Sequence, residues 1–253
     1  MFASSDIGWI RAIFLVAGLV FGSFGNVLIA RIPKGKSIGG RSACPRCKEV
    51  LAPWEIVPLI SFLILRGRCA HCGKRISAQY PIIEGATAFL FVLATFIVGE
   101  PVSAGILALV LWLLLLIAVV DEKTQMIPDV FSIPLVVLCI AEAIFMDTIE
   151  PVGPLLLGLF FAIQWLISRG KWVGSGDILL GIALGFLLGG WIRAVFCLAL
   201  AYIIGGVVAS FLLLSSRADR KSHVAFAPFL AASALLTLLY GDALLGSFLG
   251  SGI

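Results

Sequence analysis

Apolar runs long enough to cross a lipid bilayer, separated by short polar segments, dominate this sequence. A helix needs about 20 mostly apolar residues to cross the hydrocarbon core. Only 13% of the residues are charged and 61% are hydrophobic, whereas soluble domains carry about 25% charged residues, so a large soluble domain is excluded. The sequence therefore predicts an all-α polytopic membrane protein with about eight spans. The expected spans are 8–30, 84–98, 103–120, 130–147, 154–168, 178–190, 194–214 and 225–245.

Lysine and arginine predict the orientation of these spans. Ten of the 18 basic residues lie in the segment 31–83, and most of the others lie in the loops 121–129, 169–177 and 215–224. Because loops rich in these residues stay in the cytoplasm, we expect all four segments inside and both termini outside. The first apolar run lacks the features of a cleaved signal peptide, so we interpret it as an uncleaved span. No base-reading motif is present, and no nucleic-acid partner is expected.

The segment 31–83 contains a repeated cysteine motif. Two CxxC pairs are separated by 21 intervening residues, a spacing typical of the two knuckles of a zinc ribbon. The segment is too small for a hydrophobic core of its own, so a structural Zn²⁺ would stabilise it. The alternatives are four reduced thiols, or two disulfides if the loop were outside, which its basic residues disfavour. The expected ligands are Cys44, Cys47, Cys69 and Cys72.

Two acids stand at the ends of expected spans. Asp121 ends one apolar run, and Asp177 follows Gly174 and Gly176 at the beginning of another. The predicted topology brings both acids to the cytoplasmic face, and intramembrane carboxylates are costly unless they are hydrated, paired or protonated. Two facing carboxylates can share a proton and activate a water molecule for attack on a peptide carbonyl. The two glycines would let the backbone before Asp177 take a tight turn and let a substrate strand come close.

Structural roles for these acids remain open at this point. Asp129 and Asp177 stand where helix N-caps are expected, and Asp121 could pair with Lys123 at the interface. Three further acids are expected to be solvated or paired with nearby arginines: Glu49, Glu55 and Glu84. The glycines of the apolar spans are expected to allow close helix packing: Gly181, Gly185, Gly189, Gly190, Gly205 and Gly206.

Several motifs, taken in order, resemble those of the bacterial type IV prepilin peptidases, the leader peptidase/N-methyltransferase family of GxGD aspartyl proteases. The resemblance covers about residues 18–230. In that family a Pro-Phe-Gly-Pro-Phe run commonly precedes the last span, whereas this chain reads Ala-Phe-Ala-Pro-Phe at 225–229. The matching motifs are Gly22 to Pro33 with Asn26 and Arg31, the CxxC pairs, Leu65 to Arg68, Ile76-Ser77, Tyr80-Pro81 with Glu84, Asp121 with Ile127 to Asp129, and Gly174 to Asp177.

The resemblance implies an enzyme in which Asp121 and Asp177 are the catalytic pair and Asp129 lies nearby. It implies cleavage of type IV prepilins or pseudopilins after a glycine at the cytoplasmic face of the bacterial inner membrane, as in type IV pilus and type II secretion systems. Methylation of the new N-terminus from S-adenosylmethionine is also implied. The expected domains are residues 1–100, associated with methylation, and residues 101–253, the peptidase.

Two other functions compete with this one. A polytopic transporter would use intramembrane acids to relay ions, but such acids usually lie near mid-bilayer, whereas these lie at the helix ends. A zinc-stabilised scaffold for pilus or secretion assembly would require the cysteines and not the acids. Separate replacement of the acids and of the cysteines distinguishes these hypotheses.

Overall fold

The structure is a computed structural model that describes residues 4–215 and 224–249. The basic residues Arg217, Arg220 and Lys221 of the expected loop 215–224 lie outside the described residues. Within the described ranges the chain is helical, with two isolated β-bridges and no named strand. The helices are α1 (Ser4–Arg31), η1 (Ile32–Lys34), η2 (Pro53–Ile56), α2 (Ile60–Ile64), α3 (Gln79–Ile97), α4 (Pro101–Thr124), α5 (Asp129–Phe145), α6 (Val152–Ser168), α7 (Ser175–Leu188), α8 (Trp191–Leu214) and α9 (Ala227–Leu249).

The all-helical membrane fold predicted from the sequence is confirmed, and a helix covers most of each of the eight expected spans. Five described helices are long and apolar enough to cross a membrane by length and composition: α1, α3, α4, α8 and α9. Helices α6 and α7 are apolar but shorter. The number of spans therefore stays a prediction.

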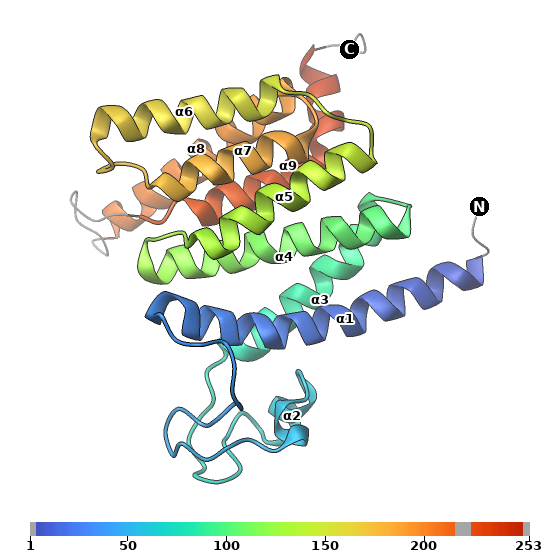
Figure 1. Ribbon diagram of the computed structural model, residues 1–253, viewed down its shortest axis with the longest axis vertical. Helices are drawn as coiled ribbons and strands as arrows, with labels where there is room; N and C mark the ends of the chain where they lie inside the picture. The colour runs from blue at the N-terminus through green and yellow to red at the C-terminus, as the bar shows by residue number, and fades with distance from the viewer. Residues whose placement is uncertain (1–3, 216–223, 250–253) are drawn as a thin grey trace. The chain divides into compact units, whose positions relative to one another are not determined.

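The chain divides into two compact units, residues 1–108 and 109–253. In the first unit, α1 packs against α3 (Figure 1). The helices approach closely because α1 has glycines at the contact: a Cβ on Gly22 would stand 2.6 Å from the Cα of Glu84, and one on Gly18 would stand 2.6 Å from the Cα of Ala88. Small residues at i and i+4 thus form the α1 side of this contact. The segment 32–78, which joins α1 to α3, contains both CxxC pairs and is called the cysteine loop below.

In the second unit, α7 contacts α5, α6, α8 and α9 (Figure 1). Its Leu180 and Leu184 are fully buried. The predicted packing role of the α7 glycines is confirmed, because a Cβ on Gly185 would stand 2.3 Å from the Cα of Pro154 on α6. The helix that carries Asp177 in its first turn is therefore surrounded by other helices of its unit.

Candidate active site and metal centre

Asp121 lies in the last turn of α4 and is 7% exposed. Its Oδ2 accepts the backbone N–H of Ala227 at 3.0 Å. Ala227 is the first residue of α9 and is fully buried, so Asp121 satisfies one of the N–H groups that a helix start leaves without an intrahelical partner. The run at 225–229 therefore holds the donor for Asp121, a contact that the sequence analysis missed because it joins residues 106 positions apart.

Asp177 is the third residue of α7 and is 9% exposed. Its Oδ2 accepts the N–H of Gly174, the N-cap residue, at 3.0 Å. This is the side-chain-to-backbone half of a capping box. Asp177 therefore supports the beginning of α7 from inside the first turn, and the prediction that it is the N-cap itself is wrong.

Asp129 is also not an N-cap. Helix α5 has Pro128 at its N-cap, with no side-chain cap hydrogen bond, and Asp129 is the exposed first residue of the helix. An acid there interacts favourably with the helix dipole without satisfying an amide.

The structure brings Asp121 and Asp177 together within the second unit. Their carboxylates are close enough to interact electrostatically. Both keep one oxygen fixed by a backbone N–H, and they come from different helices, α4 and α7. Two buried acids that interact electrostatically influence each other's protonation, so that one can stay protonated while the other is ionised.

Gly176 determines how the α4–α5 loop approaches α7. A Cβ at this position would stand 2.6 Å from the Cβ of Ile127 and 3.0 Å from its carbonyl oxygen. The backbone of Gly174 has φ −78° and ψ 161°, which any residue can adopt, and neither glycine has a positive φ. The turn before Asp177 therefore does not depend on glycine's left-handed torsions. Gly176 is required for space, because Ile127 packs on it.

The four cysteines of the two CxxC pairs converge, as predicted. Their Sγ atoms all lie within 4.8 Å of one another, and Cys44 Sγ lies 4.0 Å from Cys72 Sγ. Zn–S bonds of about 2.3 Å place tetrahedral sulfurs about 3.8 Å apart, so the four residues fit a metal ion of this kind.

The two knuckles have the same backbone pattern. The N–H of Cys44 donates to the Glu49 carbonyl, and that of Cys69 donates to the equivalent Lys74 carbonyl. N–H groups also point at sulfur: donation from the backbone of Cys47, and more weakly of Arg46, lowers the pKa of the Cys44 thiol to about 6. A thiolate is the form that binds metal, and the knuckle favours this form at Cys44. Against a hydrogen bond from the Glu49 backbone, burial and the neighbouring cysteines raise the pKa of the Cys47 thiol to about 11, so only one thiolate of this pair is favoured before metal binds.

A buried acid supports the second knuckle. Glu55 lies in η2, and its Oε2 accepts the N–H of Ala52 at 2.7 Å. The same oxygen lies 3.3 Å from Nε2 of His71, a residue that stands between the two cysteines of the second pair in the sequence. The hydrogen bond from the Ala52 N–H lowers the pKa of the Glu55 carboxyl most, and the contact with His71 lowers it further. The expectation that Glu55 is solvated or paired with an arginine is therefore wrong.

Asn26, Arg31 and Glu84 make hydrogen bonds within the first unit. Asn26 donates to the Tyr80 carbonyl at 3.1 Å and so joins α1 to the first turn of α3. Arg31 donates to carbonyls of the following loop, including that of Ile38 at 3.0 Å. Glu84 is buried, with Oε2 accepting the N–H of Leu59 at 2.8 Å, so the prediction of a solvated or arginine-paired Glu84 is also wrong.

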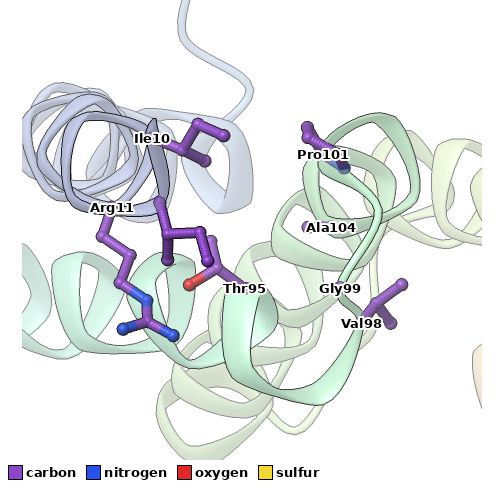
Figure 2. Close-up of a pocket in the computed structure, with 8 residues that line it drawn as sticks. Ile10, Arg11, Thr95, Val98, Gly99, Pro101 and Ala104 are labelled. Carbon is purple, nitrogen blue, oxygen red and sulfur yellow. The ribbon is translucent and has the colours of Figure 1, made fainter. Parts of the chain in front are cut away.

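A pocket in the first unit lies between the beginning of α1, the end of α3 and the beginning of α4 (Figure 2). It is apolar apart from Arg11 and Thr95, and the Arg11 guanidinium stands 3.8 Å from the centroid of the Phe96 ring. The pocket is at the opposite end of α1 from the cysteine loop. Its lining lacks the polar groups that a nucleoside with a sulfonium and a carboxylate needs, so it does not fit S-adenosylmethionine.

The fold and the site define a multi-pass, all-helical membrane protein with two buried aspartates meeting at helix ends and a loop in which four cysteines converge. Comparison with known families places it more closely. Residues 16–98 match the model described as Bacterial Peptidase A24 N-terminal domain, and residues 108–210 match the Type IV leader peptidase family. The chain belongs to the type IV leader peptidase family.

Curated relatives agree with the family models over most of their length. The chain is 34% identical over 251 residues to the prepilin leader peptidase/N-methyltransferase of Bacillus subtilis, covering 94% of this chain and 97% of the relative. It is 30% identical to the protein of that name in Pseudomonas aeruginosa, covering 93% and 92%, and 37% identical to that of Klebsiella pneumoniae, covering 72% and 86%. No solved structure matches the chain significantly.

Proposed function

We propose that the protein is a membrane aspartyl endopeptidase that removes the leader peptide from type IV prepilins or pseudopilins. Family membership and the names of its relatives support the substrate class. The observation that carries the chemistry is the meeting of Asp121 and Asp177, two buried carboxylates from separate helices that interact electrostatically. Cleavage follows a glycine of the substrate, at the cytoplasmic face.

In the proposed mechanism the two aspartates activate a water molecule between them. One carboxylate accepts a proton from the water while the water oxygen bonds to the peptide carbonyl carbon. The other aspartate, which is protonated, donates its proton to the carbonyl oxygen. Collapse of the tetrahedral intermediate breaks the C–N bond, and the amine leaves with a proton returned from the aspartates. No covalent bond to the enzyme forms.

The backbone contacts of the aspartates orient them for this role. Asp121 is held by the Ala227 N–H and Asp177 by the Gly174 N–H, each through Oδ2. A fixed oxygen on each side chain restricts its rotamer and directs the remaining oxygen. Gly176 admits Ile127 and so keeps the α4–α5 loop against the first turn of α7. These contacts position the acids before substrate arrives.

We propose that the cysteine cluster holds a structural Zn²⁺. The ion would be bound by Cys44, Cys47, Cys69 and Cys72 as thiolates, and it would supply a fixed tetrahedral crosslink between the two knuckles. With four sulfur ligands the ion has no open position, so it has no part in peptide hydrolysis.

We also propose that the new N-terminus is methylated, on the strength of the N-methyltransferase names of the relatives. The methyl donor would be S-adenosylmethionine. No described residue is assigned to that donor, and no step of the methylation is derived from the structure.

The proposed division of labour places peptide cleavage in residues 101–253 and associates residues 1–100 with methylation. The helices and the family make the protein a multi-pass inner membrane protein, and we propose that the cysteine loop and both aspartates face the cytoplasm. The basic residues of the segment 31–83 support this orientation.

Cleavage of a model prepilin by purified Asp121→Asn and Asp177→Asn variants tests the proposal. Mass spectrometry of the substrate's N-terminus reads leader removal and methylation in the same sample. Both variants should leave the leader in place, whereas Asp129→Asn, which changes the exposed first residue of α5, should still cut. Leader removal by Asp121→Asn or Asp177→Asn at the wild-type rate would overturn the aspartyl mechanism.

A further inference from the structure

Helix α2 lies inside the cysteine loop (Figure 1). Large apolar side chains on α2 and on the residues before it are exposed. Leu63 is 73% exposed and Ile64 is 69% exposed, as much as Ile82 and Phe89, each 63%, on the candidate span α3. A patch of this kind on a polar loop marks an interaction site. The α2 patch consists of Trp54, Ile56, Val57, Ile60, Leu63 and Ile64.

A hydrogen bond fixes the depth at which α2 begins. The N–H of Leu59, which precedes α2, donates to the buried Glu84 carboxylate at 2.8 Å. The Cα of Glu84 lies against Gly22 of α1, and Gly22 stands nine residues before Arg31, where α1 ends. At 1.5 Å per residue this is about 13 Å of helix. Glu84 is also the first residue of the expected span 84–98, so α2 begins at the edge of the apolar part of the α1–α3 pair and not beyond its end.

Positive charge accompanies the patch. Arg66, Arg68, Lys74 and Arg75 are exposed, and the second cysteine knuckle brings two of them together through the β-bridge between Arg68 and Arg75. The one acid in residues 51–83 is Glu55, which is buried and contacts His71. The exposed surface next to α2 is therefore cationic.

We propose that the α2 patch inserts into the headgroup–acyl boundary of an anionic membrane leaflet and attaches the cysteine loop to the bilayer. Exposed aliphatic residues with a tryptophan and flanking arginines are the composition of interfacial membrane segments, and anionic lipid attracts the four cations. The position of Leu59 beside Glu84, at the edge of the expected span 84–98, favours the bilayer over a soluble partner, because the headgroup–acyl boundary is expected at that level. The attachment holds the metal knuckles beside the membrane independently of peptide cleavage.

Quenching of Trp54 by brominated lipid tests the insertion. Full-length wild type and Trp54→Phe are placed in nanodiscs of anionic lipid with or without bromine on the acyl chains, and the difference between their emissions isolates Trp54 from the other five tryptophans. Brominated chains should remove most of the Trp54 emission. Equal Trp54 emission in the two kinds of disc would overturn the proposal.

Photo-crosslinking identifies the occupant directly and does not depend on the tryptophan change. A photoreactive residue replaces Leu63 in one variant. In the control variant it replaces Ile38, whose side chain is exposed on the same loop but outside the patch. The Leu63 position should give lipid adducts by mass spectrometry and the Ile38 position should give none. Adducts at Leu63 to added prepilin, in place of lipid, would overturn the proposal and make the patch a substrate surface.

Discussion

Asp121 combines two roles that substitution can separate, the proposed one in cleavage and the structural one at the beginning of α9. Asparagine keeps an oxygen that can accept the Ala227 N–H, whereas alanine removes the acceptor and leaves a donor on a fully buried residue without a partner. An unsatisfied buried donor costs about 1–3 kcal/mol. We therefore expect Asp121→Ala to be less stable than Asp121→Asn by about 1–3 kcal/mol, and Asp121→Asn to match wild type, because its side-chain oxygen can keep the Ala227 hydrogen bond.

The two variants should be equally inactive. Loss of a residue that acts as acid or base in a coupled pair lowers kcat by about four orders of magnitude or more. Thermal unfolding in detergent, followed by intrinsic fluorescence, measures stability, and about 2–4 °C of melting temperature corresponds to 1 kcal/mol for a chain of this size. Equal melting temperatures of the two variants would refute the role at α9, and cleavage by Asp121→Asn would refute the role in catalysis.

Three further substitutions or conditions test other parts of the molecule. Gly176→Ala should destabilise the protein by about 1–3 kcal/mol through overpacking against Ile127 and reduce cleavage. Gly174→Ala, whose Cβ meets its nearest atom at an ordinary 3.5 Å and which keeps the N–H bonded to Asp177, should have smaller effects on both; equal melting temperatures and rates of the two variants would contradict this. By elemental analysis the wild type should contain equimolar zinc, and Cys69→Ser should contain none. Equal zinc in the two proteins would exclude the site. Because protons compete with zinc for thiolates, wild-type protein should keep zinc at neutral pH and lose it on acidification, measured by dialysis against a chelator at a series of pH values; zinc retention that does not depend on pH would contradict a thiolate site.

The helical fold and the metal cluster could be predicted from the sequence because each depends on patterns within one segment. An apolar run of membrane length gives a helix whatever its neighbours are, and the CxxC pairs form knuckles through bonds to carbonyls five residues on, as Cys44 does with Glu49. The close packing at Gly185 also follows from a local run of small residues.

The site's supporting contacts could not be predicted in the same way. The Asp121–Ala227 and Glu84–Leu59 bonds join residues 106 and 25 positions apart, and nothing local to either partner indicates the other. The prediction for Glu55 is wrong because arginines are close to it in sequence, whereas the fold places His71 next to it. The cap predictions for Asp129 and Asp177 are wrong by one to three residues, since helix ends depend on which residue first takes helical torsions.

The contact between Gly176 and Ile127 has a consequence for how the site can open. Because the α4–α5 loop rests directly on the first turn of α7, neither segment can loosen without exposing the other, and the two form one cooperative unit of local unfolding. Amide hydrogens on both sides of this contact should therefore exchange with a common opening free energy. A substrate that moves the two aspartates apart must separate both segments at once. Its binding free energy must therefore offset the free energy of this shared opening, which is larger than that of rotating a single side chain.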